Sequence, residues 1–179
     1  DWSSDVCSSD LGAGPCLNPW MSAAISPRLR ASAWAAAATL LVALLGGLAT
    51  DIGPWYLALR QPAWKPPDLW FGPAWTLIYT LTAVAAVRIW EVTPAPAARR
   101  RWLAMLALNA ALNILWSLLF FTAKQPDWAL AEVALLWLSV LQLYAFARWR
   151  LPRVGWLLLP YLAWVAFAGC INLAVVRLN

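Results

Sequence analysis

The sequence predicts an all-α integral membrane protein, a bundle of five transmembrane helices with a structured extramembrane loop between the first two helices. The 179 residues are 63% hydrophobic and only 12% charged, whereas soluble domains carry about 25% charged residues. Five apolar runs are each about 20 residues long, enough to cross a hydrocarbon core of ~30 Å. They cover about residues 32–50, 71–90, 102–122, 129–147 and 154–176, so residues 21–179 are expected to form one domain.

Residues 1–20 do not share this pattern. They have neither the basic start nor the apolar centre of a secretory signal peptide, so we expect a disordered or non-native extension, with Met21 as a candidate start. Cys7 and Cys16 fall within it. The remaining cysteine, Cys170, is expected to be a small buried hydrophobe, because one thiol makes neither a disulfide framework nor a metal site.

The first span is rich in alanine, and small side chains let helices approach closely. The connection after it is unusual. Gly53 and Pro54 predict a short helix over residues 55–59, and three prolines within residues 62–67 should hold the chain extended. The aromatic residues of this connection form either a lid over the bundle or an aromatic belt at the membrane surface. Their alternation with prolines favours the lid, and the aromatics concerned are Trp55, Tyr56, Trp64 and Trp70.

The second span presents three large aromatics to one side. Phe71, Trp75 and Tyr79 are spaced four residues apart, which places them on one helical face. They directly follow the aromatic connection, so we expect this face to lie beneath the lid.

The third span carries a polar and aromatic stripe. Asn109, Asn113, Trp116 and Phe120 are spaced four, three and four residues apart. Asparagine is costly at bilayer depth unless it finds partners inside the bundle, so this stripe should face inward. A second surface of small residues, with Ala107-x-x-x-Ala111 as its core, is a weak helix-packing or dimer motif.

The fourth span places Trp137, Leu141 and Tyr144 on one face. Glu132 is the carboxylate that falls within its apolar run. An intramembrane acid is a functional hypothesis by default, but Glu132 lies only about one turn from the interfacial Trp128. We therefore expect its carboxyl group to reach water or an amide.

The fifth span repeats the pattern of the third. Tyr161, Trp164, Ala168 and Asn172 are spaced three, four and four residues apart. Two such stripes facing each other under an aromatic lid predict a pocket for a flat, mostly apolar ligand. Aromatic rings would stack on the ligand, while asparagine amides or tryptophan N–H groups would orient its polar atoms. Arg60 and Lys65 at the rim are candidates to meet carboxylates, and a tetrapyrrole or a sterol fits this pocket better than a sugar or an ion.

Several classes of function are excluded by composition. The chain contains no histidine, so it has no His general base, no His metal site and no His axial haem ligand. Hydrolytic triads of the usual kind are absent, as is a phosphate loop following a strand. We predict no metal site and no required cofactor, and a porphyrin or haem would have to be held by stacking and shape.

The basic residues are better explained as topology signals than as a nucleic-acid surface, because they lie at the ends of apolar runs. Nine of the 13 precede the first span or flank the second and fourth connections, namely Arg28, Arg30, Arg88, Arg99, Arg100, Arg101, Arg148, Arg150 and Arg153. Four lie on the opposite side, namely Arg60, Lys65, Lys124 and Arg177. The positive-inside rule therefore predicts a cytoplasmic N-terminus and an external C-terminus.

Taken together, these residues resemble the TspO/MBR family, which includes the tryptophan-rich sensory proteins and the translocator protein or peripheral benzodiazepine receptor. The resemblance covers about residues 31–179. It is carried by Trp55-Tyr56-x-x-Leu59-x-x-Pro62-x-Trp64-x-Pro66-Pro67, by Phe71, Trp75 and Tyr79, by Asn113-x-x-Trp116 and Phe120-Phe121, and by Pro160-Tyr161-x-x-Trp164 and Asn172.

The resemblance implies a dimeric bundle of five transmembrane helices that binds porphyrins, sterols and benzodiazepine-type ligands under the first loop. Bacterial members are linked to tetrapyrrole and stress regulation, and some promote porphyrin breakdown in light and oxygen. By position, the two tryptophans of that chemistry correspond to Trp75 and Trp164. Animal members carry a tyrosine in a cholesterol motif late in the fifth helix. No tyrosine lies between Asn172 and Arg177 here, which favours a bacterial-type, porphyrin-binding member.

Three functions follow as hypotheses: a ligand-binding sensor or receptor, a porphyrin transporter, and an enzyme that degrades porphyrin photo-oxidatively. The sensor is favoured, because acid–base residues are scarce and few polar groups lie at mid-bilayer. The expected partners are a hydrophobic small molecule, the lipid bilayer and a second copy of the chain, and not nucleic acid. The candidate ligand-binding residues are Trp55, Tyr56, Trp64, Pro66, Phe71, Trp75, Tyr79, Asn113, Trp116, Phe120, Trp137, Tyr161, Trp164, Ala168 and Asn172, with Trp75 and Trp164 as candidate catalytic residues.

Overall fold

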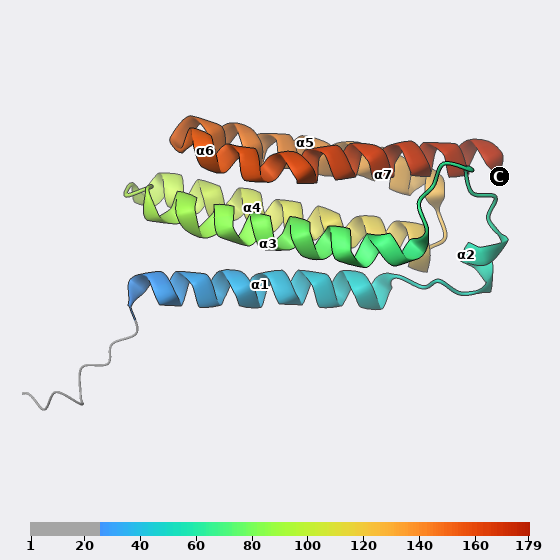
Figure 1. Ribbon diagram of the computed structural model, residues 1–179, viewed down its shortest axis with the longest axis horizontal. Coiled ribbons are helices and arrows are strands. Elements are labelled where there is room, and N and C mark those ends of the chain that lie inside the picture. The colour runs from blue at the N-terminus through green and yellow to red at the C-terminus, as the bar shows by residue number, and fades with distance from the viewer. Residues whose placement is uncertain (1–25) are drawn as a thin grey trace, which may run out of the picture.

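The computed structural model describes residues 26–179, and its ribbon is an elongated bundle of helices (Figure 1). The expectation for residues 1–20 lies outside this range. No strand occurs within residues 26–179. The helices are α1 (Pro27–Ala49), α2 (Pro54–Ala58), η2 (Asp68–Trp70), α3 (Phe71–Glu91), α4 (Pro96–Ser117), η3 (Leu118–Thr122), α5 (Pro126–Arg150), α6 (Pro152–Gly155), η4 (Trp156–Leu158) and α7 (Leu159–Leu178).

Five segments of the described chain are long and apolar enough to cross a membrane, which confirms the predicted all-α multi-pass architecture. Each observed segment starts or ends a few residues beyond its predicted apolar run. α4 begins at Pro96 rather than near residue 102, and α5 begins at Pro126 rather than residue 129. The reason is that proline is favoured in the first helical turn, where its missing N–H costs nothing. The apolar runs therefore mark the part of each helix that lies in the hydrocarbon core, whereas the prolines mark where the helices begin.

The helices α3, α4, α5 and α7 form the body of the bundle, and α1 lies along one side of it (Figure 1). α4 packs on α5, and α5 packs on α7, while α1 packs on α3 and α4. Ala49 is the one residue of α1 that is buried, whereas α5 has buried residues along its whole length. α1 is therefore the most loosely embedded of the five spans, and its contacts with α3 and α4 border two cavities.

The buried side chains form three layers along the bundle. One layer, around Trp102 and Leu158, lies at the end away from the α1–α3 connection. A second layer around Val140 and Tyr161 lies at mid-depth. The third, around Phe120, lies at the connection end and includes several contacting aromatic pairs, among them the stacked pair Trp116–Phe120 and the edge-on pair Phe120–Phe121. Many of the contacts between aromatic side chains thus lie beneath the connection, where the sequence predicted a pocket.

Polar residues inside the bundle follow the predictions in part. Asn109, Asn113 and Asn172 are buried, as expected for inward stripes. Glu132 was expected to reach water or an amide, but it is 4% exposed and neither carboxyl oxygen has a hydrogen-bond partner within the described chain. That prediction is wrong because the second turn of α5 already faces the bundle interior. Cys170 was expected to be buried and is instead an exposed residue of α7.

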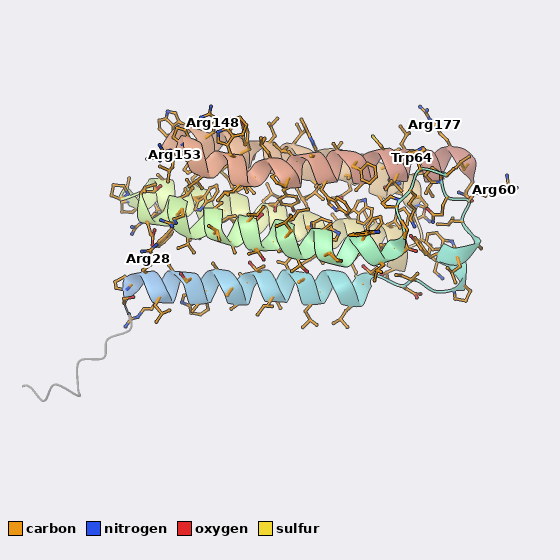
Figure 2. The ribbon with its side chains drawn as sticks, in the orientation of Figure 1. Arg28, Arg60, Trp64, Arg148, Arg153 and Arg177 are labelled. Carbon is orange, nitrogen blue, oxygen red and sulfur yellow. The ribbon has the colours of Figure 1, made fainter. Side chains whose placement is uncertain are left out.

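Basic side chains gather at both ends of the bundle (Figure 2). Arg28, Arg148 and Arg153 lie at the end away from the connection, and Arg60 and Arg177 lie at the connection end. This separation follows the predicted pattern of spans. Which end faces the cytoplasm remains a prediction of the positive-inside rule.

Candidate functional site

The connection between α1 and α3 is an ordered cap whose centre is the short helix α2. From Leu59 to Pro67 the chain forms no helix, as its prolines predicted. The last residue of the chain anchors this arm: Asn179 Oδ1 accepts from the Arg60 backbone N–H at 2.9 Å, and Asn179 Nδ2 donates to the Arg60 carbonyl at 3.2 Å. The cap is therefore attached to the end of α7 as well as to its own flanking helices.

Three side chains, here called the loop latch, tie the cap to the start of α3. Tyr56 Oη donates to Asp68 Oδ1 at 2.8 Å, and Lys65 Nζ donates to the same oxygen. The Lys65 ammonium also lies 5.5 Å from the ring centroid of Tyr56 and 5.7 Å from that of Phe71. Burial acts to lower the pKa of Lys65, but its bonds to Asp68 and Tyr56 raise that pKa above its ordinary value. Burial raises the pKa of Tyr56.

Beneath the loop latch lies a cavity of about 520 Å³, here called the loop-side cavity. Its volume falls within the roughly 300 to 1,000 Å³ of typical ligand pockets. α1, the cap, α3, α4, η3 and α7 all contribute to its wall, which is mainly aromatic and aliphatic. A mainly apolar wall that contains several aromatic rings suits a flat hydrophobic ligand.

Nine of the fifteen predicted ligand-binding residues line this cavity, and they come from the cap and from all three striped spans. They are Tyr56, Phe71, Trp75, Tyr79, Asn113, Trp116, Phe120, Ala168 and Asn172. The other six lie outside its wall, namely Trp55, Trp64, Pro66, Trp137, Tyr161 and Trp164.

Two of these six stand directly behind Trp75. The ring centroid of Trp75 is 6.0 Å from that of Tyr161 and 6.5 Å from that of Trp164, both in edge-on geometry. Trp75 also lies 5.2 Å from Tyr79 on its own helix. The candidate catalytic pair is therefore brought together, with Trp75 on the cavity wall and Trp164 in the layer behind it.

Three other predicted residues lie farther from the cavity. Trp55 supports the wall from outside through an edge-on contact with Phe120 at 6.0 Å. Trp64 is 53% exposed at the connection end (Figure 2). Trp137 borders a separate shallow groove of α5 and α7. The fourth span therefore contributes no residue to the wall of the loop-side cavity.

The asparagines of the two stripes do not offer free amides to a ligand. Asn113 Oδ1 accepts from Tyr79 Oη at 2.7 Å, and Asn113 Nδ2 donates to Tyr161 Oη at 3.1 Å. Asn172 Oδ1 accepts from Trp116 Nε1 at 3.3 Å, and Asn172 Nδ2 donates to a backbone carbonyl at 2.9 Å. These amides therefore join the helices that form the wall, and their role toward a ligand stays a prediction.

The polar lining groups that sequence reasoning missed come mainly from the cap. Gln61 lines the cavity, and its Nε2 is buried without a hydrogen-bond partner in the described chain. Asp68, Thr50 and Ser117 also line it. An unpartnered buried donor is rare in native proteins, so Gln61 is the side chain most available to a ligand acceptor. Its position just before Pro62 was the one available signal, because a residue preceding proline is held extended.

The end of α4 adds two adjacent aromatics to the wall. η3 is a π-helical turn, and its wider winding lets Phe120 and Phe121 both face the cavity although they are neighbours in sequence. Their ring centroids are 4.9 Å apart. Such turns often occur at functional sites. The motif Phe120-Phe121 was noted in the sequence, but its geometry depends on this turn.

Of the two cations predicted at the rim, only one lines the cavity. Lys65 lines the cavity within the loop latch, whereas Arg60 lies outside it and is exposed. Within residues 26–179, no group of three or more His, Cys, Asp or Glu side chains is placed to hold a metal ion. The site therefore offers stacking surfaces, one engaged ammonium and one free amide.

Comparison with known proteins agrees with this architecture. The model of the TspO/MBR family matches residues 34–178. The tryptophan-rich protein TspO of Chlorobaculum tepidum is 34% identical over 70% of this chain and 79% of that protein. The tryptophan-rich sensory protein of Cereibacter sphaeroides is 37% identical over 70% and 77%, and the translocator protein of Sus scrofa is 35% identical over 70% and 75%. The chain belongs to the TspO/MBR family.

Proposed function

We propose that this protein is a membrane receptor that binds a tetrapyrrole, porphyrin or haem, in the loop-side cavity and acts as a sensor in tetrapyrrole or stress regulation. The observation that carries the proposal is a cavity of about 520 Å³ walled by aromatic rings and closed by a cap that is anchored at two points. The relatives, a sensory protein and a translocator protein by name, support a sensor or translocator role.

The chemistry of the wall supports a flat conjugated ligand. Trp75, Trp116 and Phe120 present rings from different helices, and such rings favour offset-stacked or edge-on contact with another ring system. Gln61 supplies a free donor, and Lys65 supplies a cation that is shared with Asp68. A tetrapyrrole with carboxylate side chains would use both kinds of contact, whereas a sterol would leave the Lys65 side chain without a matching group.

Titration of the detergent-purified protein with protoporphyrin, followed by tryptophan quenching and porphyrin absorbance, tests this proposal. Ala168→Phe fills the cavity and should weaken binding by at least about tenfold. Trp75→Phe removes one stacking surface and should weaken it by a few-fold. Trp137→Phe is the matched control, since Trp137 borders a different groove. Unchanged affinity in both cavity variants would remove the loop-side cavity as the binding site.

One observation favours porphyrin breakdown as a second activity. Trp75 lies on the cavity wall with Trp164 and Tyr161 behind it, within 6.5 Å between ring centroids. Aromatic side chains in such contact can share an oxidising equivalent generated by a light-excited porphyrin and oxygen. Bleaching of bound protoporphyrin in light and air should then be slowed by Trp164→Phe, which lies outside the wall and leaves binding intact. Equal bleaching by wild type and variant would exclude a role for this pair.

A homodimer is also proposed, through the small-residue face of α4. Ala104, Ala107 and Ala111 are all exposed along that helix, and small exposed residues are typical of close helix contacts in membranes. Light scattering of the detergent-purified protein should give twice the chain mass, and Ala111→Phe should reduce it to the monomer. A monomeric wild type would contradict the proposal.

A further inference from the structure

A second cavity of about 560 Å³ lies between α1, α3 and α4, in the half of the bundle away from the cap. Its wall is almost entirely carbon, and much of it is alanine, including Ala35 and Ala38 of α1 and Ala83 and Ala86 of α3. Trp34 and Trp90 line the end farthest from the cap. The cavity is partly open, and the loosely embedded helix α1 forms one of its walls.

A layer of hydrogen-bonded side chains closes this cavity toward the middle of the membrane. Tyr79 and Asn113 line both cavities, and Asn109 and Tyr161 line the second. Tyr161 Oη donates to Asn109 Oδ1 at 3.1 Å, and Asn109 Nδ2 donates to Ser139 Oγ at 2.8 Å. Because these polar atoms satisfy one another, an occupant of the second cavity needs no polar group at its inner end.

The length of the cavity matches one leaflet of a bilayer. Its lining runs from Ala31 to Val42 on α1, which is about 16 Å at 1.5 Å per residue. Half of a hydrocarbon core of ~30 Å is about 15 Å. The cavity is therefore about as long as one leaflet is deep, which is the depth that one acyl chain occupies.

Basic residues directly precede the segments of α1 and α4 that line this cavity: Arg30 precedes Ala31, and Arg100 and Arg101 precede Trp102. Arg28 is paired with Glu91 at 2.9 Å, and Arg99 is held over the Trp90 ring at 4.5 Å. Arg30, Arg100 and Arg101 are exposed, and none forms an ion pair within residues 26–179. Exposed guanidinium groups beside a membrane surface attract anionic headgroups, and they bind phosphate well.

We propose that the second cavity is a lipid site that takes one acyl chain of an anionic glycerophospholipid, with the phosphate of its headgroup at Arg30, Arg100 and Arg101. The carbon-lined wall receives the chain, the polar layer marks its terminus, and the cations select the headgroup. This site is distinct from the loop-side cavity, so the proposal of lipid binding does not depend on the proposal of porphyrin binding.

One lining group restricts the nature of the occupant. The Thr82 hydroxyl is buried and has no partner in the described chain, although it lines the cavity. An acyl chain leaves this hydroxyl unpaired, whereas an occupant with a polar group at that depth would bond to it. Thr82→Val therefore separates the two cases, because it keeps the shape of the side chain and removes its hydroxyl.

Native mass spectrometry after incubation with phosphatidylglycerol or phosphatidylcholine tests the proposal. The wild-type protein should retain one phosphatidylglycerol per chain in preference to phosphatidylcholine. Ala83→Phe fills the cavity and should reduce retention by about tenfold, while Ala163→Phe, exposed on α7 and outside every described cavity, should not. Replacing Arg100 and Arg101 together with glutamine should abolish the headgroup preference.

The same measurements define the results that would overturn the proposal. Retention by Ala83→Phe equal to that of wild type would show that the lipid binds elsewhere. Loss of retention in Thr82→Val would indicate a polar occupant, since an acyl chain should bind this variant as well or better. Absence of any lipid adduct on a dimeric wild-type protein would indicate that a second copy of the chain covers the opening. Thermal unfolding and protoporphyrin titration of each variant confirm that it is folded.

Discussion

Tyr79 Oη donates a hydrogen bond of 2.7 Å to Asn113 Oδ1, and this bond joins α3 to α4 at the level that separates the two cavities. The bond continues through Tyr161 to Asn109, and so reaches α7 and returns to α4. Asn109 Nδ2 donates in turn to Ser139 of α5, so five side chains from four helices form one polar layer inside an otherwise apolar bundle. Because each amide uses both its oxygen and its nitrogen, the layer has a defined geometry and fixes how these helices sit against each other.

Asn113→Leu should destabilise the protein, because it leaves the Tyr79 hydroxyl buried without an acceptor. The expected loss is about 1 to 2 kcal/mol, which corresponds to a fall in the unfolding midpoint of about 2 to 8 °C for a chain of this size. Thermal unfolding in detergent, followed by circular dichroism, measures it. Adding Tyr79→Phe removes the unpaired hydroxyl and should recover part of the loss.

The control for Asn113→Leu is Gln142→Leu, at an exposed position of α5 whose amide makes no hydrogen bond with the described chain. Its unfolding midpoint should match that of wild type. If Asn113→Leu were as stable as Gln142→Leu, the polar layer would contribute nothing to helix packing.

The number of spans and the inward stripes could be predicted from sequence because both depend on periodic features. A buried asparagine needs a hydrogen-bond partner inside the bundle, so Asn109 and Asn113 correctly indicated the inward face of α4. The partner itself could not be predicted, because it depends on which helix packs opposite. The amides bond to Tyr79 and Tyr161 rather than to a ligand, and no spacing within one helix carries that information.

Gln61→Met should lower the affinity for protoporphyrin without destabilising the fold. Gln61 Nε2 is buried and unpartnered on the cavity wall, so removing it costs the free protein nothing, whereas a ligand acceptor would lose one hydrogen bond of about 1 kcal/mol, or roughly five-fold in Kd. Tryptophan quenching measures the affinity. Gln125→Met, an exposed position that does not line the cavity, is the matched control and should leave Kd unchanged.

A combined result distinguishes a ligand contact from a structural role for Gln61. Weaker binding with an unchanged unfolding midpoint supports a direct contact. Weaker binding accompanied by a lower midpoint would instead mean that the amide supports the cap, and unchanged binding would leave it without a ligand role.

The loop latch should loosen at alkaline pH. The pKa values of Lys65 and Tyr56 are both raised above their ordinary values of 10.5 and 10.0. A group whose pKa is raised on folding stabilises the folded state fully below its unfolded pKa, and this contribution is lost as the pH rises through the folded value. The unfolding midpoint should therefore be insensitive to these groups below about pH 10 and fall above it.

Lys65→Met should flatten that alkaline fall, because it removes the ammonium that bonds to Asp68. Lys124→Met is the matched control, since Lys124 is exposed at the same end and forms no ion pair within residues 26–179. Midpoints measured between pH 8 and pH 11 decide the question. A Lys65→Met curve that keeps the wild-type slope would show that the latch does not govern the cap.

Two of the predicted pocket aromatics lie outside the wall of the loop-side cavity for a related reason. Trp137 and Trp164 were both counted as pocket residues because they fall on aromatic faces of their helices, yet neither lines the loop-side cavity. Each of helices α5 and α7 packs on more than one neighbouring helix, so an aromatic on its inner side can contact a helix other than the one across the cavity. The cap was predicted better, because prolines restrict its backbone locally and independently of packing.

Glu132→Leu should stabilise the protein. The Glu132 carboxyl group is 4% exposed, and neither oxygen has a hydrogen-bond partner in the described chain. Burying a polar group without a partner costs about 1 to 3 kcal/mol, so an apolar side chain of similar size should raise the unfolding midpoint by several degrees. Glu132→Gln replaces one unpartnered polar group with another and should gain less.

Asp127→Leu, in the same helix, is the control for Glu132→Leu, because it should change the unfolding midpoint in the opposite direction. Asp127 is an exposed carboxylate in the first turn of α5, where a negative charge stabilises the helix by about 0.3 to 1 kcal/mol. Its removal should lower the midpoint slightly, while Glu132→Leu raises it. If both substitutions lowered the midpoint, the Glu132 carboxyl group would have a stabilising partner in solution, and its burial without one would be contradicted.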